Sequence, residues 1–163
     1  QAMAQRAHHG FGMKIVVHNR SPIKQAILKR YNATQVATLD DLLPQSDFVS
    51  LHCPGGAENR HLMNNRRLES MKPEAFLINT ARGEVIDEYA LAQSLMFGCI
   101  GGAGLDVYQG EPKISSHLLQ CDNLVVLPHL GSASTETRNE MGNRVFQNLI
   151  EFFNGREPLD KVA

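Results

Sequence analysis

The alternation of short apolar runs with helix-forming stretches is the feature of this 163-residue chain that most limits its fold. Apolar runs lie at residues 13–18, 47–52, 75–79, 101–107 and 124–127. Helix-forming stretches lie at residues 1–7, 23–31, 37–43, 65–71, 88–97 and 135–154. Strands that are apolar throughout, and not only at every second position, are typical of a parallel sheet covered by helices on both faces. The sequence therefore predicts a doubly wound, Rossmann-like α/β domain.

Two residues mark the expected ends of helices, and one helix shows a clear apolar stripe. Thr38 is a plausible N-cap within the 37–43 stretch, and Gly98 follows the 88–97 helix. The last helix carries apolar residues at a helical spacing, at Met141, Val145, Leu149, Phe152 and Phe153. We predict that this stripe belongs to the core.

Composition and charge exclude several classes of protein. The net charge is -1 with a pI near 6.7, and no run of like charge offers a nucleic-acid surface. No apolar run approaches the roughly 18 residues of a membrane span, and no secretory leader is visible. Cys53, Cys99 and Cys121 stand singly, and the pair His8-His9 has no carboxylate or cysteine at ligand spacing, so no disulfide framework or metal site is predicted. A cytoplasmic location is the simplest expectation.

The chemistry of a doubly wound domain is expected at the carboxyl ends of its strands, where loops converge. Arg82 follows an apolar strand, and its planar guanidinium suits a carboxylate or phosphate, although it could instead tie down a loop. His129 also follows a strand and could transfer a proton or simply support its loop. Glu111 could orient that imidazole or be merely exposed.

Three motifs that follow one another in the sequence are more informative than these single residues. INTARGEVIDEYAL contains Arg82, GAGLDVYQGEP contains Glu111, and NLVVLPHLGSAS contains His129. In this order the motifs resemble those of the D-isomer-specific 2-hydroxyacid dehydrogenases, and the resemblance covers essentially the entire chain. Gly55-Gly56 is most similar to the glyoxylate and hydroxypyruvate reductase branch.

The resemblance implies a role for each of the three residues. Arg82 would hold the substrate carboxylate and keto oxygen, His129 would protonate that oxygen as hydride arrives, and Glu111 would keep the imidazole protonated. Asp106 would contact the nicotinamide carboxamide. The remaining cofactor-lining residues, beside Arg82 and His129, would be Cys53, Pro54, Thr80, Ala81 and Gly131.

The segment Asn19-Arg20-Ser21 bears on the choice of nicotinamide cofactor. A domain that prefers NAD usually has an acidic residue at the end of its second strand, where it binds the ribose diol and repels a 2′-phosphate. Here three residues offer hydrogen-bond donors and a positive charge instead. We therefore predict that NADP(H) is preferred and NAD(H) possible; the alternative is that Arg20 faces solvent and discriminates little.

One motif of the family is missing. No G-x-G-x-x-G lies between a first strand and a first helix, so we expect a fragment that lacks the N-terminal part and, alone, gives little turnover. In the strand order 3-2-1-4-5-6, the missing first strand would leave a gap in the sheet. Residues 1–135 would form the nucleotide-binding domain, and residues 136–163 a helix and tail returning toward a substrate domain.

Two functions remain open at this stage. The first is an oxidoreductase that transfers hydride between NADPH and a small 2-keto acid such as glyoxylate or hydroxypyruvate, and it is a homodimer by resemblance. The alternative is a non-catalytic NAD(H)-binding regulatory module of the same fold. The intact Arg82, Glu111 and His129 trio favours the enzyme.

Overall fold

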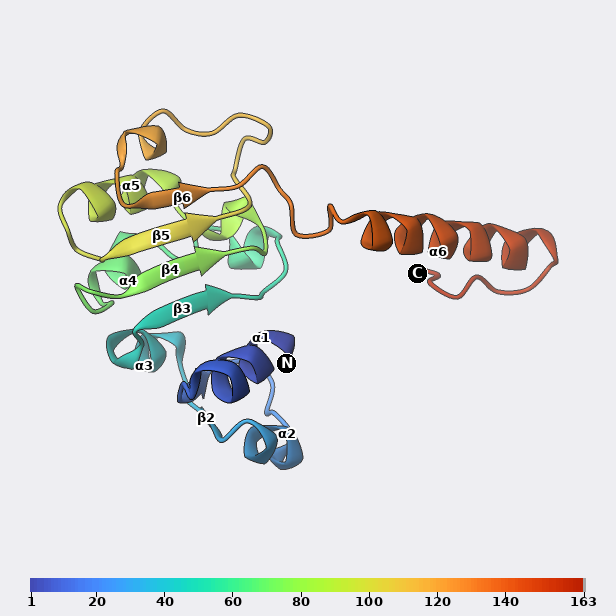
Figure 1. The fold of residues 1–163 in the computed structure, drawn as a ribbon, viewed down its shortest axis with the longest axis horizontal. Helices are drawn as coiled ribbons and strands as arrows, with labels where there is room; N and C mark the ends of the chain where they lie inside the picture. Colours follow the sequence, from blue (N-terminus) through green and yellow to red (C-terminus); the bar gives the residue numbers. More distant parts are fainter. Residues whose placement is uncertain (163) are drawn as a thin grey trace.

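Two parallel sheets form the centre of the molecule (Figure 1). The computed structural model describes residues 1–162. The smaller sheet pairs β1 (Ile15–Val17) with β2 (Ala33–Gln35). The larger sheet has the order β3 (Phe48–Leu51), β4 (Phe76–Asn79), β5 (Gly102–Leu105), β6 (Leu124–Val126), and every neighbouring pair is parallel. The predicted α/β class is confirmed.

Helices connect the strands in the predicted order, except that β2, between α2 and α3, was not predicted. The α-helices are α1 (Ala2–Gln5), α2 (Gln25–Arg30), α3 (Leu39–Leu42), α4 (Asn65–Glu69), α5 (Glu88–Met96) and α6 (Thr135–Phe153). Shorter turns are the π-helical η1 (Arg6–Gly10), which continues α1, and the 3-10 turns η2 (Leu43–Gln45), η3 (Ala57–Asn59), η4 (Gly83–Val85) and η5 (Leu118–Gln120). Across residues 1–162, no helix combines the length and the apolar character needed to cross a membrane.

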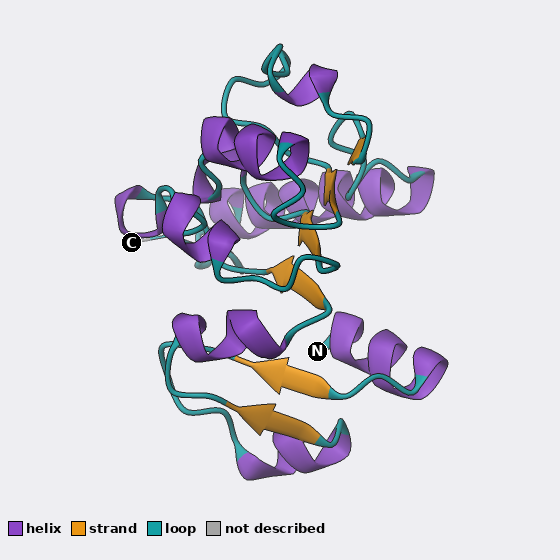
Figure 2. Ribbon diagram, turned by 90° about the vertical axis from the view of Figure 1, so that its left-hand side faces the viewer, coloured by secondary structure: helices purple, strands orange, loops and turns teal. Residues whose placement is uncertain are grey.

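The two sheets stay separate, as the missing first strand predicts. β1 pairs with β2 and β3 pairs with β4, but within the described chain no strand joins β1 to β3. Figure 2 shows the smaller sheet set apart from the larger one along the direction in which strands would be added. The expected gap in the order 3-2-1-4-5-6 is therefore confirmed at the position of strand 1.

The core lies on one face of the larger sheet. Leu77 of β4 and Leu91 of α5 are fully buried there, and Leu68 of α4 packs into the same cluster. On the opposite face the stacked rings of Phe48 and Phe76 stay exposed, at 56% and 41%. The prediction of helices on both faces thus holds for only one face of this sheet in the described residues.

The last helix differs from its prediction. The boundaries of α6 agree with the expected 135–154 helix, but the prediction that its apolar stripe belongs to the core is wrong. Met141 is 55% exposed and Phe153 is 80% exposed. Figure 1 shows the reason: α6 projects away from both sheets, so its apolar face has no neighbouring element to cover it in the described chain.

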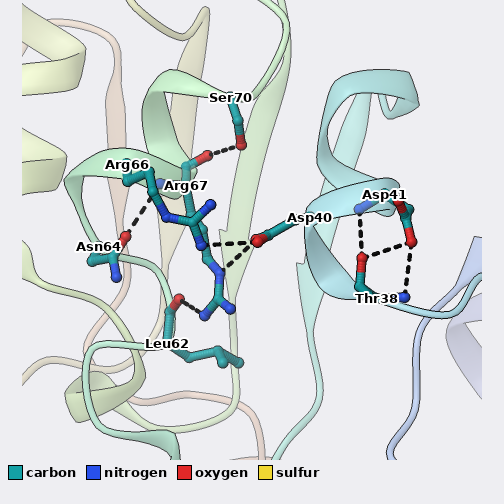
Figure 3. A network of polar contacts seen from close by, with 8 residues as sticks. All are labelled: Thr38, Asp40, Asp41, Leu62, Asn64, Arg66, Arg67 and Ser70. Carbon is teal, nitrogen blue, oxygen red and sulfur yellow. Dashed lines mark hydrogen bonds and ion pairs between the residues drawn. The ribbon is translucent and has the colours of Figure 1, made fainter.

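A polar network fixes the helices that flank β3 (Figure 3). The Thr38 side chain accepts a hydrogen bond from the Asp41 backbone N–H, and the Asp41 carboxylate accepts one from the Thr38 backbone N–H, which confirms Thr38 as the N-cap. Asp40 accepts from Arg67 Nε at 2.9 Å and from Arg66 Nη2 at 2.8 Å, and these bonds lower the pKa of Asp40. Because Asp40 lies on α3 and the arginines on α4, the network holds the two crossover helices of β3 together.

Candidate active site

The loops after β3 and β4 line an open pocket at the carboxyl edge of the larger sheet. Its volume is about 470 Å³, within the range of small-molecule sites. The β3 loop contributes His52, Cys53, Pro54 and Gly55, and the β4 loop contributes Thr80, Ala81 and Arg82. Five of these residues were predicted to line a cofactor: Cys53, Pro54, Thr80, Ala81 and Arg82.

A buried amide explains how Arg82 can end an apolar strand. Asn79, the last residue of β4, is completely buried. Its Nδ2 donates to the carbonyl of Arg82 at 2.9 Å, and its Oδ1 accepts from the Ala81 backbone N–H at 3.0 Å. The turn is therefore fixed from inside the protein, while the Arg82 side chain stays exposed at the pocket.

Glu111 and His129 form a direct pair. The Nδ1 of His129 lies 2.7 Å from Glu111 Oε2, and Glu111 Oε1 accepts from the Tyr108 backbone N–H at 3.0 Å. The bond to His129 is the main reason that the pKa of Glu111 lies below its ordinary value, and the positive charge of Arg82 also lowers it. The structure thus brings Glu111 and His129 into contact, and the charge of Arg82 acts on the same carboxylate.

The backbone around His129 is unusual and is held by Asp106. His129 has a φ of 56°, in the left-handed region that residues other than glycine seldom adopt. Asp106 is almost fully buried, and its two carboxylate oxygens accept from the backbone N–H groups of Leu130 at 2.6 Å and Gly131 at 2.8 Å. Asp106 therefore sets the course of the loop that carries His129, and its contact with a nicotinamide carboxamide stays a prediction.

Three positioning residues were missed at the level of the sequence. The buried Tyr108 hydroxyl lies 2.8 Å from the carbonyl of Leu127 and so ties the end of β5 to the end of β6. Gln109 Nε2 donates to the carbonyl of Ile86 at 2.5 Å. Glu84 accepts from the Gly56 backbone N–H at 2.5 Å and joins the two pocket loops. Their hydrogen-bond partners are distant in the sequence, so no local pattern predicts these contacts. Only the position of the three residues inside strand-end motifs could have indicated a role at the site.

Partial burial affects the protonation of the Cys53 thiol at the pocket. Partial burial raises the pKa of the Cys53 thiol, which keeps it protonated near neutral pH. A protonated thiol is a poor nucleophile. Cys53 therefore fits a pocket-lining role and not that of a nucleophile.

The loop after β1 places the three predicted cofactor-discriminating residues on the surface. Asn19, Arg20 and Ser21 are all exposed. Asn19 Nδ2 donates to the Ser21 carbonyl at 2.9 Å, so this amide supports the loop itself. Arg20 Nη1 lies 2.8 Å from Glu58 Oε2 in the loop after β3. Arg20 is therefore ion-paired, while its side chain stays 64% exposed, and its part in the choice of cofactor stays a prediction.

Parallel strands with a pocket and charged residues at their carboxyl ends define a Rossmann-like dinucleotide-binding domain. A family model described as "D-isomer specific 2-hydroxyacid dehydrogenase, NAD binding domain" matches residues 1–131. The chain belongs to this family.

Named relatives agree with this assignment. The chain is 43% identical over 162 residues to a glyoxylate reductase of Thermococcus litoralis, covering 99% of this chain and 48% of the relative. It is 45% identical over 156 residues to a glyoxylate/hydroxypyruvate reductase B of Enterobacter agglomerans, covering 95% and 48%. The chain thus spans about half the length of the curated relatives it matches.

A solved structure shows the same arrangement. The NADPH-dependent glyoxylate/hydroxypyruvate reductase of Sinorhizobium meliloti, in complex with NADP and malonate, superposes with a TM-score of 0.89 at 37% identity. The match covers 97% of this chain and 48% of that one.

Proposed function

We propose that the protein transfers hydride between NADP(H) and a small 2-keto acid such as glyoxylate or hydroxypyruvate. The observation that carries this proposal is the imidazole–carboxylate pair of His129 and Glu111, which lies at the same edge of the sheet as the pocket lined by Arg82. The glyoxylate reductases among the relatives support the substrate class.

The residues of the pocket fit a nicotinamide cofactor. Cys53, Pro54, Thr80 and Ala81 present small side chains and loop backbone to a pocket of about 470 Å³. Such walls allow a flat ring and a ribose to approach closely. When bound, the reduced nicotinamide supplies the hydride that is added to the keto carbon.

In the proposed reaction each of these side chains has a task. Arg82 binds the substrate carboxylate through parallel N–H groups and so orients the keto carbon. Glu111 occupies Nδ1 of His129, which leaves Nε2 as the nitrogen that donates its proton to the keto oxygen. As hydride and proton are added, the 2-keto acid becomes a 2-hydroxy acid and the cofactor is oxidised.

Substitutions in the full-length protein test these tasks. His129→Gln is expected to lower kcat for NADPH-dependent glyoxylate reduction by roughly 10²–10⁴-fold, the usual contribution of a positioned acid. Arg82→Gln is expected to raise the KM for glyoxylate by about tenfold or more, since a charge-assisted contact is lost. His9→Gln, in η1, is a matched control that should leave both constants unchanged.

The same assay distinguishes the alternatives. A regulatory module would bind the cofactor and give no turnover. If His129→Gln and wild type reduce glyoxylate equally fast, the proposed proton donor is wrong.

Arg20 supports the preference for NADP(H). Its guanidinium stands at the end of β1, where a 2′-phosphate would lie, and no carboxylate from its own loop repels that phosphate. Arg20→Asp is expected to shift the ratio of kcat/KM for NADPH and NADH strongly toward NADH. An unchanged ratio would contradict recognition of the 2′-phosphate by Arg20.

Two expectations about the whole protein are kept as proposals. Residues 1–135 would form the nucleotide-binding domain, with α6 and the tail returning toward a substrate domain, and the protein would be a homodimer. The exposed apolar side chains of α6 support a covering partner for that helix. Light scattering of the full-length protein gives its mass, and a monomeric mass would contradict the dimer.

A further inference from the structure

Arg20 is already paired with an anion of this chain. Its Nη1 lies 2.8 Å from Oε2 of Glu58, and the two side chains are 64% and 62% exposed. Arg20 follows β1 of the smaller sheet, whereas Glu58 lies in η3, which follows β3 of the larger sheet. The pair therefore spans the two sheets at the edge where the cofactor would lie.

The loops that carry the pair are both braced. Gln35 of β2 donates through Nε2 to the carbonyl of Ser21 at 3.2 Å, next to Arg20. Asn59, next to Glu58, is 7% exposed and donates through Nδ2 to the carbonyl of Pro54 at 3.0 Å. Because neighbours of both residues are anchored, the guanidinium and the carboxylate are presented to each other from fixed backbone positions.

A carboxylate and a phosphate compete for the same guanidinium. Both anions accept parallel N–H bonds from the planar fork of arginine. A 2′-phosphate arriving at Arg20 must displace Glu58, and the displaced carboxylate then remains as a nearby negative charge. NADH has a hydroxyl at this position and leaves the pair in place.

We propose that Glu58 is a specificity-determining residue that weakens NADP(H) binding by competing with the 2′-phosphate for Arg20. The proposal rests on the proposed recognition of NADP(H) by Arg20. The competition would moderate the preference for NADP(H) over NAD(H), because Arg20 favours binding of the 2′-phosphate and Glu58 opposes it.

The exposure of the pair limits the size of the effect. Ion pairs between solvated side chains are weak and screened by salt, so removing the competitor is expected to improve NADPH affinity by about two- to five-fold. The gain should shrink as ionic strength rises.

The test measures the affinities of NADPH and NADH for the full-length protein by nicotinamide fluorescence. Glu58→Gln keeps the shape of the side chain and removes its charge, and it is expected to tighten NADPH about two- to five-fold while leaving NADH nearly unchanged. In an Arg20→Met background the same substitution should have a clearly smaller effect on NADPH, because the contested cation is gone and only the repulsion by the carboxylate is removed. Equal tightening of both cofactors, or none of NADPH, would overturn the proposal.

Arg20→Met alone distinguishes failure of this inference from failure of the proposed function. If Arg20→Met leaves the NADPH/NADH preference unchanged, the recognition of NADP(H) by Arg20 is wrong. If it weakens NADPH and Glu58→Gln changes nothing, only the competition is wrong. Glu157→Gln is the matched control, because Glu157 is another exposed, ion-paired glutamate, bound to Lys161 in the C-terminal tail.

Discussion

Replacing Gly83 by alanine tests how the loop that carries Arg82 packs against the loop that carries Glu111. Gly83 is buried directly after Arg82, and a Cβ at this position would lie 2.0 Å from the backbone carbonyl carbon of Tyr108 and 2.5 Å from Gln109 N. Ordinary contacts begin near 3.4 Å, so one backbone segment must move by about 1.4 Å. Tyr108 cannot yield easily, since its N–H is bonded to Glu111 and its hydroxyl lies against the β6 end.

The expected loss of stability is at the upper end of what an added methyl group costs in a well-packed site. We expect Gly83→Ala to lower the free energy of unfolding by about 3 kcal/mol or more, because the clash is with backbone and not with a flexible side chain. Glyoxylate reduction should fall together with stability, since the displaced segment leads to Glu111. The measurements are urea unfolding and kcat/KM of the full-length protein.

Gly142→Ala provides the same chemical change without the clash. Gly142 lies inside α6, and among residues 1–162 a Cβ there would meet no atom within 4 Å. Alanine should stabilise this helix by about 1 kcal/mol, seen as a higher melting temperature of the helical circular dichroism signal, with activity unchanged. If Gly83→Ala unfolds at the same urea concentration as wild type, the packing argument for the two loops is wrong.

Three further predictions concern the core, a cap and the tail. Leu77→Ala empties a fully buried site and should cost about 2–5 kcal/mol in urea unfolding; a smaller loss would mean that the core collapses around it. Thr38→Ala should cost about 1 kcal/mol in the same assay, whereas Thr38→Ser should retain the cap. The pKa of Asp160 is lowered to about 2, chiefly by its hydrogen bond with Arg144. The tail contact should therefore be intact above pH 3.8 and be lost as pH falls through about 2, and Arg144→Gln should return the carboxyl NMR titration midpoint toward 3.8; an unmoved midpoint would refute this cause.

Most secondary structure could be predicted from local sequence, and the failures have physical causes. β1 and β3 to β6 lie in apolar runs that are visible in the sequence. β2 was missed because Ala33–Gln35 is short and partly polar, and it becomes a strand through its backbone pairing with β1. The apolar spacing in α6 correctly predicted a helix. The same spacing does not indicate which element covers the apolar face of that helix.

The location of the site was predictable, whereas its internal contacts were not. Parallel strands place all their carboxyl ends at one edge, so strand-end residues such as Arg82 and His129 had to be candidates. The partners of Asp106 and Arg20 lie 24 or more residues away, and no local pattern names them.

The sequence by itself determined the helices, every strand except β2, and the residue types at the strand ends, because these follow from local apolar patterns. The gap between the sheets followed from the missing glycine-rich motif and the strand order of the fold. Only the tertiary structure decided that Asp106 holds the His129 loop, that Glu111 takes Nδ1 of the imidazole, and that Glu58 occupies Arg20. The reason is that hydrogen bonds and ion pairs depend on distances of about 3 Å between groups that are remote along the chain, and only the folded backbone sets those distances.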